Sequence, residues 1–187
     1  MSITVREVTS DDRAALARML ERIEQFKPEE VAVALELVDA SLRDAAGSGY
    51  ECLVALDSSP SREATAGVEA SGSSTPAQSL DLPTGVDSLV GYICVGPTPM
   101  TEATWDLYWI AVDPGSQGRG IGRRLYSAFA ERAIARGARQ VRIETSSKES
   151  YAATGGFYER LNFSIDGRLR DFYADGDDLL IFYRRIA

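Results

Sequence analysis

The chain has 187 residues, of which 44% are hydrophobic; this is enough to bury one sizeable core, so a single domain over residues 1–187 is expected. Its 28 Asp and Glu outnumber its 20 Lys and Arg, and the net charge of −8 argues against nucleic acid or an anionic membrane as a partner. The sequence has no histidine, which excludes Ser-His and Cys-His nucleophiles and the usual zinc sets, so we expect no metal site.

The first part of the chain is predicted to form a strand, two helices and a second strand. Apolar and polar residues alternate over residues 3–8, as in a half-buried strand. A helix follows, and a second one starts at Pro28 and is ended by Gly47 and Gly49. Residues 50–56 are an apolar run typical of a strand. No run approaches membrane-spanning length, and the chain enters its first strand without a leader, so we expect a soluble cytoplasmic protein.

The segment from about 57 to 88 differs in composition from the rest of the chain. It has no apolar periodicity and is filled with Ser, Ala, Gly, Thr and Pro. Such a composition does not supply enough apolar surface to build a packed core. We therefore interpret this segment as a disordered insertion between two hairpin strands of the single domain.

The second half of the chain alternates strands with two helices. Strands are predicted at residues 89–95, 105–112, 140–144, 163–169 and 179–186, helices at about 120–136 and 151–161, and a polar loop at 171–178. This order predicts an α+β fold, in which helices cover both faces of a sheet. One parallel strand pair is expected, where the helix from Gly120 joins the strands before and after it.

The segment Gln117-Gly118-Arg119-Gly120-Ile121-Gly122 lies between a predicted strand and a predicted helix. Glycines allow a ligand to approach the backbone closely, and the free N–H groups at the start of a helix bind phosphate. Arg119, Arg123 and Arg124 add local positive charge to an otherwise acidic chain. The segment therefore predicts an anion site, although the same glycines also suit a plain tight turn.

Two other phosphate-binding loops have related glycine patterns. A Walker loop needs Lys followed by Ser or Thr after its last glycine, and this chain has Arg123 after Gly122. A dinucleotide-binding loop needs a third glycine, and Arg123 stands in its place. Glu144 does lie where a ribose-binding acid is expected, so dinucleotide binding remains an alternative.

The spacing Gln117-x-x-Gly120-x-Gly122 resembles the acetyl-CoA motif of the GNAT superfamily of N-acetyltransferases. Residues 90–93, 107–112 and 157–163 resemble successive elements of the same family, so the resemblance covers nearly all of the chain except the insertion. It implies an α+β fold with a mixed, mostly antiparallel twisted sheet, helices on both faces and one central parallel strand pair. It also implies acetyl-CoA as cosubstrate.

The resemblance implies a set of cofactor-binding residues: Ile110, Ala111, Val112, Gln117, Gly118, Arg119, Gly120, Ile121, Gly122 and Arg123. Main-chain groups of Ile110 and Val112 are expected to pair with the pantetheine arm, and the N–H of Ile110 to hold the thioester oxygen. The N–H groups of the glycine turn, helped by Arg123, are expected to hold the pyrophosphate.

The resemblance also implies catalytic residues. Asp106 falls where many relatives place a catalytic Glu, and Tyr158 matches the tyrosine that commonly protonates the leaving thiolate. Glu144 and Glu102 are reserve candidates for the base. From the residues alone, Asp106 also suits an exposed strand position and Tyr158 a place in the core. The sequence departs from the family pattern at Asn162, where relatives usually have Gly.

The acceptor is expected to be a small amine or amino acid, with a peptide or protein N-terminus as second choice. The acidic run within residues 171–178 is expected to be solvated, although it also suits a cationic amine. A non-catalytic CoA-binding or regulatory module remains the alternative, and the sequence leaves open whether the chain acts as a homodimer.

Overall fold

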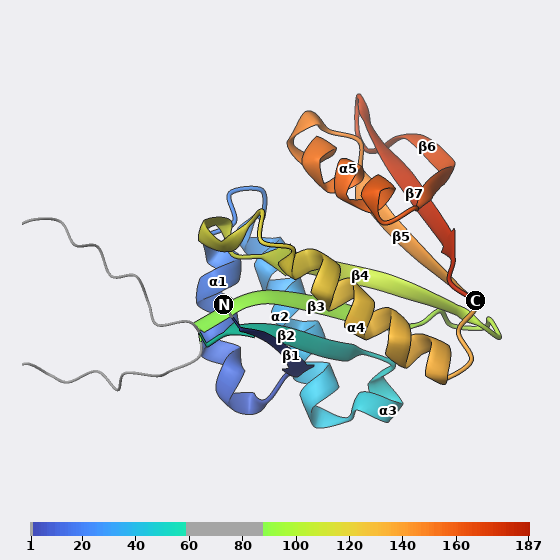
Figure 1. The fold of residues 1–187 in the computed structure, drawn as a ribbon. Coiled ribbons are helices and arrows are strands. Elements are labelled where there is room, and N and C mark those ends of the chain that lie inside the picture. Colours follow the sequence, from blue (N-terminus) through green and yellow to red (C-terminus); the bar gives the residue numbers. More distant parts are fainter. Residues whose placement is uncertain (1, 59–87) are drawn as a thin grey trace, which may run out of the picture.

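The sheet of this protein has seven strands in the computed structural model, which describes residues 2–58 and 88–187 (Figure 1). The strands are β1 (Ile3–Glu7), β2 (Glu51–Asp57), β3 (Ser88–Pro97), β4 (Thr104–Val112), β5 (Gln140–Ser146), β6 (Ser164–Ala174) and β7 (Asp177–Arg185). Their order in the sheet is β1-β2-β3-β4-β5-β7-β6. Neighbouring strands are antiparallel except for β4 and β5, so the predicted mixed sheet with one central parallel pair is confirmed.

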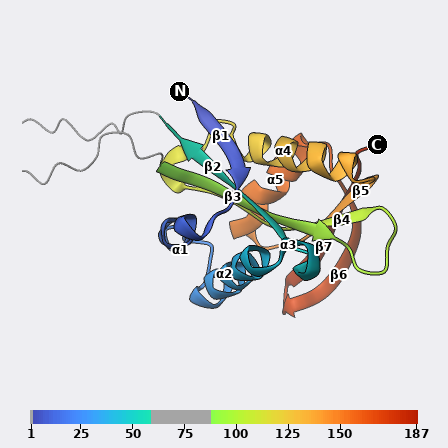
Figure 2. The ribbon, with the colours of Figure 1, turned by 90° about the horizontal axis from the view of Figure 1, so that it is seen from below.

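Helices cover both faces of the sheet, as predicted (Figure 2). They are α1 (Arg13–Glu21), α2 (Pro28–Arg43), the one-turn α3 (Ala45–Ser48), α4 (Ile121–Ala135) and α5 (Ala152–Arg160). Figure 2 shows α1, α2 and α3 on one face and α4 and α5 on the other. Within the described residues, no helix combines the length and apolar character needed to cross a membrane.

Each layer of helices buries its own apolar cluster against the sheet. The apolar stripe of α1 is fully buried at Leu16, Met19 and Leu20, where it packs against side chains of β2 and β3. On the other face, α4 buries Leu125 and Phe129. Helices with a single apolar stripe are stable only when that stripe is covered, so the two clusters fix which face each helix takes.

The hairpin of β6 and β7 is longer than predicted, because the expected polar loop at 171–178 is mostly strand. Its two acidic residues at the start of β7 are buried rather than solvated, which corrects our expectation. Asp177 accepts a hydrogen bond from Ser146 and forms an ion pair with Lys148. Asp178 pairs with Arg168 and accepts the N–H of Asp171 at 2.8 Å. These carboxylates hold the hairpin together instead of facing water.

The expected insertion at about 57–88 lies, except at its two ends, outside the described residues. Its ends belong to the sheet, because Asp57 at the end of β2 pairs with Ser88 at the start of β3. The chain therefore leaves the sheet and returns to it at one place.

Candidate active site

The parallel strands β4 and β5 separate soon after they begin. Their pairing joins residues 104–106 to residues 140–142 and then stops, although both strands continue. Figure 1 shows β5 turning away together with β6 and β7, while β4 stays beside β3. Within the described chain, residues 107–112 therefore have a strand partner on one side only. An open strand edge offers its N–H and C=O groups to a ligand.

A β-bulge interrupts β4 on this open stretch. The pairing with β3 steps from Leu107 opposite Val95 to Trp109 opposite Cys94, so Tyr108 is one extra residue. A bulge bends its strand and re-aims the groups that follow. The strand residues predicted to bind the cofactor, Ile110, Ala111 and Val112, come after the bulge and lie on the open stretch.

The turn before α4 has the backbone shape of an anion site. Gly118 and Gly120 have φ angles of +74° and +76°, a region that side chains other than Gly rarely adopt. A Cβ placed at either glycine would meet nothing within 4 Å, so the space beside both is open. Gly120 is the N-cap of α4, and no described side chain caps the helix. The first N–H groups of α4 therefore receive no side-chain cap from the described residues, and uncapped N–H groups of this kind can bind an anion.

Gly122 differs from Gly118 and Gly120 because close packing, not a positive φ, requires a glycine there. A Cβ at this position would lie 3.1 Å from Cζ of Phe157, which is a tight contact. Gly122 therefore lets the first turn of α4 approach α5 closely. The packing explains why a glycine stands inside the helix, where it would otherwise lower helix stability.

The two arginines of the predicted cofactor site have different surroundings. The guanidinium of Arg119 lies with Nη2 at 2.6 Å from Oδ2 of Asp57, so it ties the turn to the end of β2. Its Nε is buried and has no hydrogen-bond partner within the described residues. Arg123 is exposed in the first turn of α4. The glycine turn and the first turn of α4 therefore each carry an arginine of the predicted site, of which Arg119 is paired with a carboxylate.

Tyr158 of α5 is in the core and still has a free donor. Only 4% of its surface is exposed, and its ring packs edge-on against Phe182 with centroids 5.3 Å apart. Its hydroxyl has no hydrogen-bond partner among residues 2–58 and 88–187. Burial raises the pKa of the Tyr158 phenol well above its usual value. The side chain is therefore a neutral phenol with its proton in place near pH 7.

Asp106 is buried, not exposed on the strand as one interpretation of the sequence held. Its side chain is 7% exposed, and its Oδ1 accepts a hydrogen bond of 2.7 Å from Nε of Arg142. Nη1 of Arg142 lies 3.2 Å from Oε1 of Glu144, so one guanidinium contacts both the candidate base Asp106 and the reserve candidate Glu144. Hydrogen bonding to Asp106 raises the pKa of Arg142, which therefore stays charged. Glu102, the third candidate, is exposed in the loop before β4 and pairs with Arg139.

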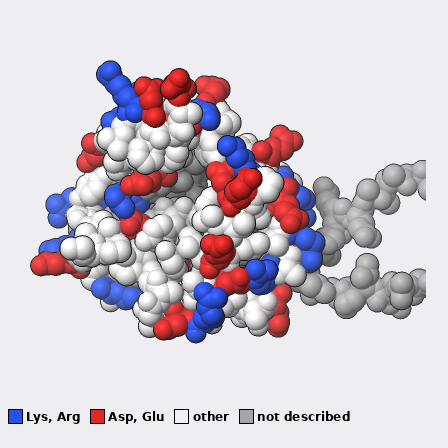
Figure 3. All heavy atoms as spheres, turned by 180° about the vertical axis from the view of Figure 1, so that it is seen from behind, with Lys and Arg blue, Asp and Glu red and all other residues white. Residues whose placement is uncertain are grey.

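Asp106 and Tyr158 lie on opposite faces of the sheet, as the side-chain alternation of β5 and the packing of Tyr158 show. Ile143 of β5 lies opposite Phe182 of β7, and both belong to the cluster that contains Tyr158. Successive strand residues point to opposite faces, so Arg142 and its partner Asp106 lie on the face of α1 and α2. Figure 3 views this face and shows it hollowed beside the lobe at upper left, with acidic and basic side chains along the hollow.

Sequence reasoning did not single out Arg142 as a residue of this site, and it did not predict the bulge at Tyr108. The polar side chain of Arg142 between two apolar neighbours reads as an ordinary exposed strand position, and its partner became visible only with the β4–β5 register. Nothing in the sequence marked Tyr108 as a bulge. Burial, followed by the nearby Asp106 carboxylate, raises the pKa of Tyr108 to about 12.

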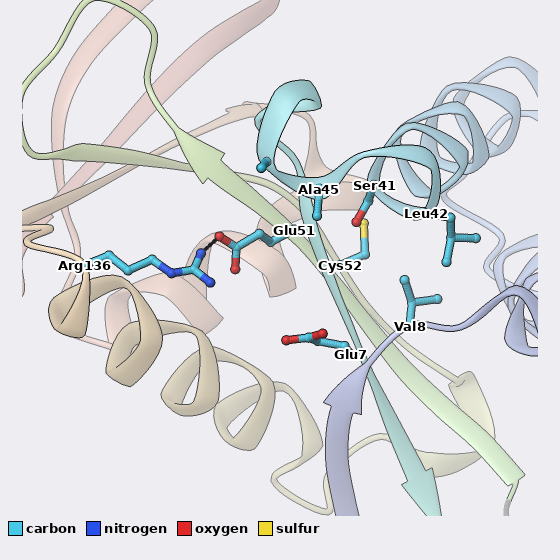
Figure 4. Close-up of a pocket in the computed structure, with 9 residues that line it drawn as sticks. Glu7, Val8, Ser41, Leu42, Ala45, Glu51, Cys52 and Arg136 are labelled. Carbon is cyan, nitrogen blue, oxygen red and sulfur yellow. Dashed lines mark ion pairs between the residues drawn. The ribbon is translucent and has the colours of Figure 1, made fainter.

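A second hollow lies away from these residues, beside the start of β2 and the end of α4 (Figure 4). Its cavity volume is about 360 Å³. The carboxylate of Glu51 and the guanidinium of Arg136 pair at its wall, and Ser41 and Cys52 also line it. None of the predicted site residues lines this hollow, so we do not include it in the candidate active site.

Comparison with known proteins identifies the family and supports the fold. Residues 83–165 match the model of the acetyltransferase (GNAT) domain. A protein from Desulfovibrio desulfuricans assigned to the GNAT family of acetyltransferases is 35% identical, with a TM-score of 0.81 over 100% of both chains. The ribosomal-protein-S18-alanine N-acetyltransferase of Escherichia coli is 18% identical, with a TM-score of 0.65 over 100% of this chain and 95% of its own. The protein yncA of Salmonella typhimurium, solved with acetyl-CoA, is 17% identical with a TM-score of 0.66 over the same shares. No curated protein sequence matches the chain.

Proposed function

Because the chain belongs to the GNAT family of acetyltransferases, we propose that it transfers an acetyl group from acetyl-CoA to a primary amine. The observation that carries the proposal is the open edge of β4, which leads directly into the glycine turn and the uncapped start of α4. One end of this track suits an extended amide chain and the other a diphosphate. Such a track fits the pantetheine arm and the pyrophosphate of coenzyme A.

Backbone groups supply most of the proposed cosubstrate site. The N–H groups of Gln117, Gly118, Gly120 and Gly122, with the N–H of Ile121 and the side chains of Arg119 and Arg123 nearby, hold the pyrophosphate. The open space beside Gly118 and Gly120 supports this role, since a side chain there would occupy it. Main-chain groups of Ile110 and Val112, with Ala111 between them, pair with the pantetheine amides, and the N–H of Ile110 holds the thioester oxygen. Acetyl-CoA supplies the electrophilic thioester carbon.

A carboxylate on the α1 and α2 face removes the proton from the incoming ammonium group. This step is needed because a protonated amine has no lone pair with which to attack. Asp106 is the proposed base, acting directly or through water, and Glu144 is the alternative. Arg142 contacts both carboxylates and keeps them close to the place where β4 and β5 separate.

Tyr158 donates a proton to the departing thiolate from the other face of the sheet. Its phenol is neutral, buried and without a hydrogen-bond partner in the described chain, so its proton is not committed elsewhere. A sulfur anion released into an apolar environment is poorly solvated and gains from that proton. Deprotonation of the amine and protonation of the sulfur thus belong to different sides of the sheet.

The proposed acceptor is a small primary amine or amino acid, and an N-terminal amine of a peptide or protein is the second choice. Solved neighbours with this fold are named for different acceptors: a ribosomal-protein alanine in one and an aminoglycoside in another. These neighbours are 18% and 15% identical, so they support the fold and do not select the acceptor. The identity of the acceptor must therefore be inferred from the residues of this chain.

The test of the proposed function is CoA release from acetyl-CoA, followed with a thiol reagent, against a panel of amines, amino acids, amino-acid amides and short peptides. We expect acceptor-dependent release that is lost when acetyl-CoA is omitted. If acetyl-CoA binds and no acceptor supports turnover, the chain is a non-catalytic CoA-binding module, and our proposal is wrong.

A further inference from the structure

Resting on the proposed function, we propose that the acceptor carries no carboxylate beside its amino group, and that the Arg142–Glu144 ion pair enforces this selection. The inference follows from the charges that meet the acceptor on the α1 and α2 face. The inference excludes free amino acids from the proposed acceptors. Small amines without a carboxylate and the N-terminal amines of peptides remain.

Arg142 carries a guanidinium on this face, and this guanidinium already binds two carboxylates of the protein itself. A guanidinium binds carboxylates through several N–H groups at once. Here Nε of Arg142 donates to Asp106 at 2.7 Å, and Nη1 lies 3.2 Å from Oε1 of Glu144. Two carboxylates and one guanidinium give this trio a net charge of −1. An arriving carboxylate therefore meets a negative group instead of an available cation.

The charges of Lys148 and Glu30 near this face do not reverse that sign. Lys148, after β5, has its Nζ 3.0 Å from Asp177. Across the face, the hydroxyl of Tyr151 lies 3.4 Å from Oε1 of Glu30, at the start of α2. Glu144 itself is the accessible member of the trio, with 43% of its side chain exposed. An ammonium group gains from this surplus of negative charge, whereas the carboxylate of a free amino acid is repelled by it.

Glu144 sets the selection, because it is exposed and because its removal changes the trio in two ways. The substitution Glu144→Gln brings the net charge of the trio from −1 to zero. It also removes the carboxylate that occupies Nη1 of Arg142, so that this nitrogen becomes available to a substrate carboxylate. The discrimination between the two acceptor classes should then decrease, whatever the effect on the absolute rate.

The experiment compares phenylalaninamide with phenylalanine, which share their amine and side chain and differ in one carboxylate. Any other amide and acid pair from the acceptor panel serves equally. We expect wild type to favour the amide in kcat/KM by about tenfold or more, as one unfavourable charge at short range predicts. Glu144→Gln should reduce that ratio several-fold. Because the ratio is compared between variants, the different amine pKa values of the two acceptors cancel.

Glu131→Gln is the matched control, because Glu131 is exposed on α4, which covers the opposite face. It removes the same charge and should leave the ratio unchanged. A wild-type preference for the amino acid, or the same ratio in wild type and Glu144→Gln, overturns the inference while CoA release still supports the acetyltransferase. If no acceptor releases CoA, the proposed function fails first and the inference fails with it.

Discussion

Asp106 and Tyr158 lie on opposite faces of the sheet where β4 and β5 separate. Arg142 holds Asp106 on the face of α1 and α2, and Phe182 contacts Tyr158 on the face of α4 and α5. The pairing of β4 with β5 ends at residues 106 and 142, so no ladder joins these two described strands beyond this point. In the proposed mechanism, a thioester bound beside this point meets the amine and Asp106 on one side of the sheet and Tyr158 on the other.

The first prediction concerns the proton donor. Tyr158→Phe keeps the ring and its packing against Phe182 and removes only the hydroxyl. We expect kcat to fall on the order of 100-fold, while the dissociation constant of acetyl-CoA changes little. Steady-state turnover and calorimetric titration with acetyl-CoA measure the two effects separately. A variant with the turnover number of wild type would exclude Tyr158 from the mechanism.

The second prediction concerns the base and depends on pH. A carboxylate acts as a base only when it is ionised, so the rate of wild type should fall as the pH drops through the pKa of that group. Asp106→Asn should lower the rate near pH 7 and flatten this acidic limb. Profiles of kcat/KM for Asp106→Asn and Glu144→Gln identify the group. If only Glu144→Gln flattens the limb, the base lies on β5 and our assignment to β4 is wrong.

The sequence predicted the part of the site that depends on local backbone. The glycine turn and the start of α4 near Gly120 follow from the conformations that a short segment allows. The parallel strand pair follows from the order of the elements, because a helix joins the two strands. The buried state of Asp106 and its ion pair with Arg142 were not predicted. They depend on which residues of two distant strands lie side by side, and this register is set by the packing of the whole sheet.

The long C-terminal hairpin was missed for a related reason. The acidic residues before Leu179 suggested a solvated loop, because a charged run has no apolar face to bury. In the structure, Asp177 and Asp178 find partners in Lys148 and Arg168, and the strand continues through them. A charged run is predicted to be a loop when its ion-pair partners are not known. Here the partners lie on other segments of the fold, so the sequence alone did not reveal them.

The third prediction concerns the tight packing at Gly122. A side chain here would meet the ring of Phe157, whereas one at Gly118 meets open space. Gly122→Val should therefore lower the melting temperature by several degrees through overpacking, which typically costs about 1–3 kcal/mol. Gly122→Val combined with Phe157→Ala should recover part of the loss. Thermal unfolding of the three variants measures this coupling, and strictly additive effects would contradict the contact.

The fourth prediction concerns stability at low pH. Two hydrogen bonds from Arg6, at 2.6 and 2.8 Å, lower the pKa of Asp12 to about 2, and the N–H of Thr9 contributes further. A lowered folded-state pKa means that the ionised group stabilises the fold above its unfolded pKa of about 3.9, and that this stabilisation is lost as the pH falls toward 2.

Asp12→Asn should therefore cost roughly 1–2 kcal/mol at pH 7, after allowance for solvent around Arg6, and progressively less between pH 4 and pH 2. Denaturant unfolding of wild type and Asp12→Asn at a series of pH values gives the difference directly. A difference that stays constant down to pH 2 would show that the carboxylate charge of Asp12 is not what stabilises the fold.

The most direct test of the central claim, that the glycine turn binds the pyrophosphate of acetyl-CoA through its backbone, is the ligand-induced shift in melting temperature. A ligand at a hundredfold excess over its dissociation constant stabilises the folded state by about 2.7 kcal/mol, so acetyl-CoA should raise the melting temperature of wild type and NAD should not. Gly120→Val should abolish the shift. Gly137→Val is the matched control, because Gly137 after α4 also has a positive φ and open space beside it, and it should keep the shift. Stabilisation of wild type by NAD but not by acetyl-CoA, or a full acetyl-CoA shift in Gly120→Val, would contradict the account.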